Sequence, residues 1–117
     1  MFRFGKSHDK FETILGPTTR FDGHMQCEGG VRIEGQVNGG SIATSGNIIV
    51  GKSAQVEADL QGHDVLISGK VHGRIVASGQ LAILANGAVH GDVEIGSILI
   101  EEGGTLNGKS VIRSSSA

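Results

Sequence analysis

A short phrase recurs six times along the chain: a small residue, a variable one, an apolar one, a polar one and a second small one. The clearest copies are GKVHGRI at 69–75 and GAVHGDV at 87–93. The central apolar residues of the six copies are Phe21, Val37, Val56, Val71, Val89 and Leu106. The first and last are 85 residues apart over five intervals, so the mean repeat is 17 residues. A fixed period is typical of a solenoid, in which each repeat packs only on its neighbours.

Two further apolar columns repeat with the same period, which predicts three short strands in each repeat. One column consists of the pairs Val31/Ile33, Ile48/Val50, Val65/Ile67, Leu81/Ile83 and Ile98/Ile100. The other consists of Met25, Ile42, Leu60, Ile75, Val93 and Val111. The pairs alternate with period two, which indicates strands and not a helix. Three strands within 17 residues leave one or two residues for each corner, and glycine suits such sharp bends.

The sequence therefore predicts an all-β, single-domain protein that is a triangular parallel β-helix, or solenoid, of about six rungs over residues 14–112. Successive rungs of such a coil are about 4.8 Å apart, so six rungs make a rod roughly 25 to 30 Å long. We expect residues 1–13 to form a flexible N-terminal tail and residues 113–117 a disordered C-terminal tail.

The composition narrows the functional classes. The chain has 20 glycines, four phenylalanines and no tryptophan or tyrosine, so we expect an aliphatic core. The formal net charge of −2 gives no reason to expect nucleic-acid binding, which needs a basic face. Cys27 is the single cysteine, and we interpret it as an unreactive thiol that forms no internal disulfide. No segment resembles a signal peptide or a membrane span, so we expect a cytoplasmic protein.

Residues 103–110, GGTLNGKS, fit the pattern of a nucleotide-binding P-loop. That pattern binds phosphate only where a strand feeds the loop and a helix follows it, and here only VIRSSSA follows. The octapeptide is better explained as the sixth copy of the repeat. We expect neither a bound nucleotide nor any other cofactor.

The residue after each central apolar position should face outward, which gives the column Asp22, Asn38, Glu57, His72, His90 and Asn107. His72 and His90 would lie on adjacent rungs. One alternative is therefore a trimeric hexapeptide-repeat acyltransferase or a zinc enzyme that uses this pair. The favoured interpretation is a solvated polar face without catalytic or metal-binding residues, because zinc needs at least three protein ligands and only His24 or His63 could be added.

The two ends of the predicted rod are its most informative surfaces. A solenoid normally needs caps, because its ends expose unpaired backbone groups and half-buried apolar side chains. The sequence contains no candidate cap, so we expect each end to stack on another copy of the chain. The predicted polymerisation interface consists of Phe21, Met25, Ile98, Ile100, Leu106 and Val111.

The first residues have a different composition and fit no rung. Aromatic side chains are interleaved with cations, a combination that binds the surface of anionic membranes. The predicted membrane-binding residues are Met1, Phe2, Arg3, Phe4 and Lys6. The alternative is a disordered tail without a membrane role.

Together these phrases resemble the bactofilins, β-helical polymer-forming cytoskeletal proteins of bacteria. The resemblance covers residues 13–112 and rests on TILGPTTRFDG, VRIEGQVNG, GKVHGRI, GAVHGDV and ILIEEGGTLNG, although many members carry an aromatic residue where this chain has Leu106. It implies a right-handed β-helix and nucleotide-independent polymerisation through the rod ends. It also implies association with the inner face of the cell membrane through a segment beginning Met-Phe, and roles in cell shape and in placing cell-wall or polarity proteins.

Overall fold

The computed structural model describes residues 11–112, which form one sheet of thirteen strands and contain no helix. The strands are β1 (Phe11–Leu15), β2 (Arg20–Cys27), β3 (Gly30–Ile33), β4 (Gln36–Thr44), β5 (Ile48–Val50), β6 (Gln55–Gly62), β7 (Val65–Ile67), β8 (Lys70–His72), β9 (Ile75–Ile83), β10 (Ala88–His90), β11 (Val93–Ile100), β12 (Thr105–Asn107) and β13 (Ser110–Ile112). Every ladder between them is parallel. The predicted all-β parallel solenoid is confirmed.

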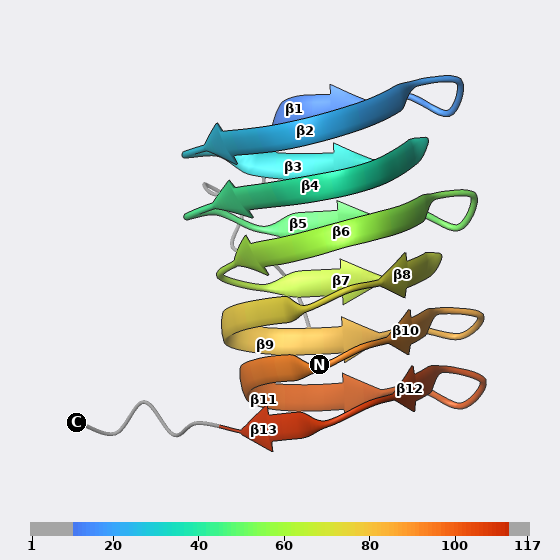
Figure 1. Cartoon of the computed structure of the whole chain (residues 1–117). Coiled ribbons are helices and arrows are strands. Elements are labelled where there is room, and N and C mark those ends of the chain that lie inside the picture. Colours follow the sequence, from blue (N-terminus) through green and yellow to red (C-terminus); the bar gives the residue numbers. More distant parts are fainter. Residues whose placement is uncertain (1–10, 113–117) are drawn as a thin grey trace.

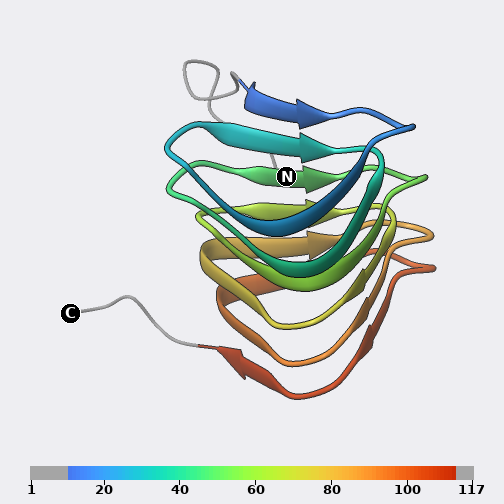
Figure 2. The same cartoon turned by 45° about the horizontal axis from the view of Figure 1, so that its top comes forward.

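The strands wind into six stacked rungs with three faces (Figures 1 and 2). Face 1 contains β1, β3, β5, β7 and the second parts of β9 and β11. Face 2 contains the first parts of β2, β4 and β6, followed by β8, β10 and β12. Face 3 contains the remaining parts of β2, β4, β6, β9 and β11, followed by β13. In Figure 1 the chain descends while running left to right on the far side and right to left on the near side, which is a right-handed coil.

The interior is a column of aliphatic side chains. The predicted central column stacks in register across face 2, from Phe21 on the first rung to Leu106 on the last. Its four valines between those ends are buried, as are Ile48 and Leu60 on the other two faces. Complete burial of one such side chain stabilises the folded state by about 1.5 to 3 kcal/mol. The stacking of branched residues from rung to rung therefore stabilises the coil.

The corner between faces 1 and 2 has two lengths, which explains why the repeat interval varies. Rungs one, three, five and six carry a turn closed by a backbone hydrogen bond, such as the 3.1 Å bond from Ala54 N–H to the Gly51 carbonyl. These turns form the loops that project on one side of Figure 1. The second and fourth rungs pass directly from β3 to β4 and from β7 to β8. Insertions at this corner leave the inward-facing columns in register.

Glycine at the corner between faces 2 and 3 sets the register of the following strand. Gly73, Gly91 and Gly108 have φ angles of 142°, 144° and 143°, which side chains rarely allow. A Cβ atom added at Gly91 would lie 2.1 Å from the Gly73 carbonyl oxygen, so the backbones also approach too closely for any side chain. Each of these glycines is therefore required by both conformation and space.

This corner corrects one predicted column. Val93 lies two residues after Gly91, and the same spacing after Gly108 places Ser110 beside it. Val111 instead pairs with Glu94, so Val111 faces outward, and Ile112 pairs with the buried Ile95. The prediction that Val111 continues the inward column is wrong, because it aligned side-chain type and ignored the spacing that the glycine imposes.

The first strand begins earlier than expected. β1 starts at Phe11, so residues 11–13, which the sequence analysis assigned to the tail, belong to the first rung. Residues 1–10 and 113–117 lie outside the described part of the chain, so the flexible tails expected there stay predictions.

Candidate assembly surfaces at the ends of the coil

Among the strands of residues 11–112, those at both ends of the coil are paired on one side only. At the first rung, β1 pairs with β3 and β2 pairs with β4. At the last rung, β12 pairs with β10 and β13 pairs with β11. Each end therefore offers a row of backbone N–H and C=O groups to another strand, which is the condition for β-augmentation.

The N-terminal end exposes a mixed apolar surface. Phe21 and Met25 are half-buried and pack against the core from the first rung, where they stack on Val37 and Ile42 of the second. Cys27 is likewise half-buried, and its Sγ atom lies 3.4 Å from Thr13 Oγ1. Because these side chains have a neighbouring rung on one side only, a docked rung would complete their burial.

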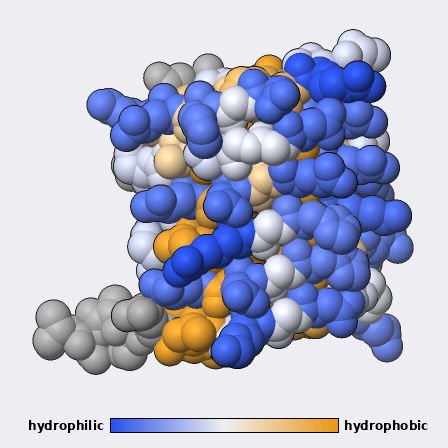
Figure 3. All heavy atoms as spheres, viewed as in Figure 1, coloured by the Kyte–Doolittle hydropathy of each residue, from blue (hydrophilic) through white to orange (hydrophobic). Residues whose placement is uncertain are grey.

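The C-terminal end exposes aliphatic side chains together with one inward serine, Ser110. Ile98 and Leu106 are half-buried against the core, and Ile100 is 44% exposed. Ile112 is 57% exposed, although its register places it on the inward side. In Figure 3 hydrophobic residues, in orange, reach the surface at the bottom of the molecule. The inward side chains of the last rung therefore form a layer of the core that is covered on one side only.

No cap covers either end among the residues that the structure describes, because those residues contain no helix and every strand belongs to a rung. Stacking on another copy therefore remains the arrangement that would satisfy the edge groups and bury the apolar residues together.

The predicted interface residues sit at the ends with one exception. Phe21, Met25, Ile98, Ile100 and Leu106 are inward residues of the two terminal rungs. Val111 belongs to the last rung but faces outward, so it does not lie in the end layer. Ile112 takes that place, and the two-residue spacing after each corner glycine is the sequence signal that identifies it.

The predicted membrane-binding residues cannot be placed. Met1, Phe2, Arg3, Phe4 and Lys6 all lie outside the described residues. Within residues 11–112, no helix is long and apolar enough to cross a membrane.

The two histidines that the alternative enzyme would need lie side by side on face 2. The rings of His72 and His90 stack with centroids 4.7 Å apart and planes 17° apart. His90 Nδ1 lies 3.4 Å from the amide nitrogen of Asn107 on the next rung. The described residues contain no group of three or more histidine, cysteine or carboxylate side chains arranged to hold a metal ion. Among the described residues, the pair therefore lacks the third ligand that zinc needs.

A shallow groove of about 740 Å³ follows the corner between faces 3 and 1 across the first four rungs. It includes Cys27 at one end and His63 with Ser78 further along. His63 Nδ1 lies 3.1 Å from Ser78 Oγ, and His24 Nδ1 makes the same type of contact with Ser41 Oγ at 2.8 Å on face 3. Each pair joins neighbouring rungs at the exposed surface, so we interpret both as links between rungs.

The P-loop-like octapeptide is part of the coil. Residues 103–110 comprise the turn before β12, β12 itself and the corner at Gly108. Leu106 stacks on Val89, in the same way as the central residue of each other copy stacks on its neighbour. The strand that follows is β13, so within the described residues no helix N-terminus faces this loop.

Comparison with known proteins points to one family. The family model Bactofilin, described as polymer-forming cytoskeletal, matches residues 13–111. Bactofilin BacO of Myxococcus xanthus (strain DK1622) is 33% identical over 96 residues, which cover 82% of this chain and 75% of BacO. Bactofilin BacP of the same organism is 26% identical over 97 residues, which cover 83% of this chain and 40% of BacP.

A solved structure is also similar. It is a cryo-EM reconstruction of Thermus thermophilus bactofilin double helical filaments. The match has a TM-score of 0.78 and 32% sequence identity, and it covers 86% of this chain and 99% of the Thermus chain. The coil described above is thus shared with a protein that has been seen in a filament.

Proposed function

The chain belongs to the bactofilin family of polymer-forming cytoskeletal proteins, and we propose that it is a scaffold protein that assembles end to end into filaments. The observation that carries this proposal is the pair of uncapped ends. In the described part of the chain, each terminal rung has strand edges without a partner strand around half-buried apolar side chains. A rung from another copy would continue both the hydrogen-bonded ladders and the aliphatic core.

Assembly of this kind needs no nucleotide. The contact is made by strand edges and by residues such as Leu106 and Ile112, which are exposed without any change in the rest of the coil. No step of the proposed assembly therefore requires nucleotide hydrolysis. We further propose that the protein is not an enzyme and has no cofactor, since its role is carried by its surfaces.

The proposed location is the cytoplasmic side of the cell membrane. The support is the composition of MFRFGKSHDK, in which phenylalanine at positions 2 and 4 alternates with cations. A filament multiplies such a tail, and many weak anchors on one polymer bind a membrane far more tightly than one. Such a filament would organise cell shape or position cell-wall or polarity proteins.

Electron microscopy of the purified full chain without nucleotide tests the proposal. We expect thin filaments in buffer alone, unchanged when ATP or GTP is added. Discrete particles at all protein concentrations, or filaments that form only with nucleotide, would contradict the proposed assembly. Discrete trimers with stoichiometric zinc would instead favour the enzyme.

A further inference from the structure

An apolar stripe runs along the outside of face 1 for the whole length of the coil. Parallel register aligns one outward-facing residue of each rung with the next: Ile14, Arg32, Ile49, Leu66, Ala82 and Leu99. Five of these six residues, which we call the face 1 stripe, are apolar. The matching outward column of face 2 carries Asn38, Glu57, His72, His90 and Asn107. Face 1 therefore differs from a normal solvated face.

The stripe is open at its ends and shielded at its centre. Ile14 is 61% exposed and Leu99 is 39% exposed, while Ile49 and Leu66 are half-buried. Ala82 is buried although it faces outward and is not part of the internal core. Every described element belongs to the coil itself, so no described element is layered over this face. A column that exposes large apolar side chains such as Ile14 and Leu99 is a candidate binding surface.

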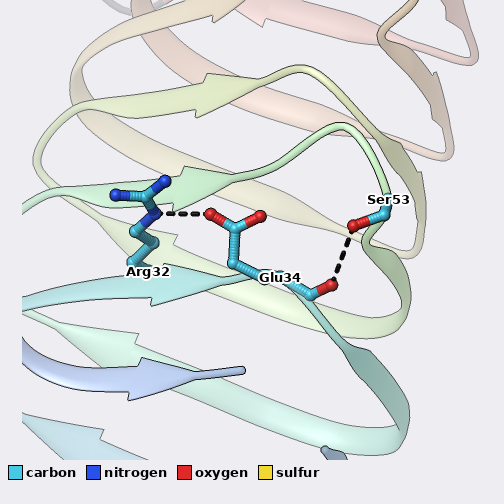
Figure 4. A network of polar contacts seen from close by, with 3 residues as sticks. All are labelled: Arg32, Glu34 and Ser53. Carbon is cyan, nitrogen blue, oxygen red and sulfur yellow. Dashed lines mark hydrogen bonds and ion pairs between the residues drawn. The ribbon is translucent and has the colours of Figure 1, made fainter. Parts of the chain in front are cut away.

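Arg32 is the one charged residue in the stripe, and its charge is paired. Its Nε lies 2.5 Å from Glu34 Oε2, and the Ser53 hydroxyl donates a 3.2 Å hydrogen bond to the Glu34 backbone carbonyl (Figure 4). The Glu34 carboxylate reaches back from the corner to this nitrogen, so the charge of Arg32 is compensated where the side chain lies. Arg32 therefore interrupts the stripe on the second rung with a paired charge.

The borders of face 1 are acidic. Among residues 13–104, whose side chains the structure describes, the face and the two corners that flank it carry five carboxylates and two cations. The carboxylates belong to Glu28, Glu34, Asp64, Glu101 and Glu102, and the cations to Arg32 and Lys52. The chemistry that fits this surface is an extended segment with apolar side chains and positive charge.

We propose that the face 1 stripe binds residues 1–10 of the same chain, MFRFGKSHDK, as an extended segment. β1 is the first strand of face 1, so this segment joins the coil at Phe11, at one end of the stripe. Ten residues extend up to about 33 Å. Five rung spacings of about 4.8 Å amount to about 24 Å, so the segment is long enough to reach the last rung.

The side chains of the segment match the stripe. Phe2 and Phe4 lie on the same side of an extended chain, because side chains alternate with period two. Arg3, Lys6 and Lys10, against the single carboxylate of Asp9, give the segment a net positive charge, which suits a surface with acidic borders. A second copy is a poorer occupant, since two face 1 surfaces together would oppose acidic borders of the same sign. The tail is also held at high effective concentration by its covalent link.

The docked tail competes with the proposed membrane anchor. Phe2 and Phe4 cannot lie on the stripe and insert into lipid at the same time. If nine-tenths of the tails are docked, the apparent affinity for a membrane falls about tenfold. This competition rests on the proposed function, whereas docking itself does not.

A single tryptophan tests the docking, because the natural chain has no tryptophan or tyrosine. In full-length Phe4→Trp, we expect blue-shifted emission relative to a free peptide of residues 1–10 with the same substitution. Adding Leu66→Asn or Leu99→Asn should return the emission to that of the peptide. The matched control is Val76→Asn, a half-buried outward position on face 3, which should change nothing.

Three results would overturn the proposal. One is emission identical to the free peptide, and another is a blue shift that persists in both Leu66→Asn and Leu99→Asn while circular dichroism shows intact β structure. Using two positions guards against a variant that fails to fold. The third is a blue shift that disappears on dilution, which would assign the docking to a neighbouring copy.

Vesicles of anionic phospholipid separate this proposal from the membrane anchor. Leu66→Asn should bind vesicles about tenfold more tightly than the parent chain, because its tail is released. A blue shift without vesicle binding supports docking and refutes only the anchor. Vesicle binding that is equal in Leu66→Asn and the parent, together with peptide-like emission in both, overturns docking and leaves the anchor in place.

Discussion

The imidazole rings of His72 and His90 are stacked, with centroids 4.7 Å apart, at the same position of two adjacent rungs. Asn107 and Glu57 occupy that position on the rungs to either side. The exchange of histidine for asparagine and glutamate within one column agrees with the interpretation of this face as a solvated polar surface.

Replacing both histidines tests that interpretation. His72→Ala with His90→Ala should leave filament length and number unchanged, because neither ring reaches the interior or an end of the coil. The measurement is electron microscopy combined with metal analysis of both proteins. Zinc that is stoichiometric in the parent protein and lost in the double variant would favour the alternative of a zinc enzyme that uses His72 and His90.

The glycine at the corner between faces 2 and 3 should be irreplaceable. Gly91→Ala introduces a Cβ atom 2.1 Å from the Gly73 carbonyl oxygen at a φ of 144°. Backbone strain at such an angle costs on the order of 1 to 3 kcal/mol, and the steric overlap adds to it. Denaturant unfolding followed by circular dichroism measures the loss.

Gly23→Ala is the matched control. Gly23 has a φ of 129°, but an added Cβ atom there meets no other atom within 4 Å. Gly23→Ala should therefore lower the free energy of unfolding only by the cost of backbone strain, without a cost from steric overlap. Equal destabilisation by the two substitutions would contradict the idea that close backbone approach selects glycine at the corner.

The corrected register of the last strand predicts unequal roles for two adjacent residues. Ile112→Ser should weaken assembly, because stacking would bury the 57% of this side chain that is exposed. That burial is worth roughly 1 to 2 kcal/mol, equivalent to a contact about 5- to 30-fold weaker. Val111→Ser should have little effect, since Val111 faces outward. Pelleting assays across protein concentrations compare the assembly of the two variants. A larger loss of assembly in Val111→Ser than in Ile112→Ser would instead support the predicted column in which Val111 faces inward.

Deleting residues 1–10 should leave filaments intact and abolish binding to anionic vesicles. The deletion stops at residue 10 because Phe11 is already paired with Gly30 in the first rung. Vesicle co-sedimentation measures the loss, and raised salt should weaken binding by the intact chain because its charge component is screened. Unchanged co-sedimentation of the truncated protein would refute the anchor, and loss of filaments would show that the tail takes part in assembly.

Most of the fold could be predicted from sequence because its repeat is short and each repeat makes the same contacts. The pairs Val31/Ile33 and Ile48/Val50 are neighbours in space because they are one period apart, so periodicity directly predicts contacts. The columns failed only at the last rung, where Ser110 occupies an inward position and apolar type no longer indicates direction.

The sequence predicts where the end surfaces lie, but it does not predict every residue that forms them. Terminal residues such as Leu106 belong to the same columns as the core, whereas Ile112 is identified only by the spacing after Gly108. The face 1 stripe was missed because outward residues were considered only next to the central column. Leu66 and Leu99 lie between inward pairs, where an apolar residue resembles part of a continuous core strand.

The most direct test of end-to-end assembly is the sedimentation velocity of Leu106→Arg. Leu106 is an inward residue of the last rung, so a docked rung would enclose the new charge. An unpaired charge in such a contact costs about 3 to 5 kcal/mol, whereas in the free chain the long side chain reaches water past the open end. We expect β-rich particles no larger than a dimer, since a dimer is still possible through the first rung. Lys109→Ala, an exposed neighbour in the same segment, should assemble normally. Long polymers of folded Leu106→Arg would contradict the claim that the C-terminal rung is an assembly surface.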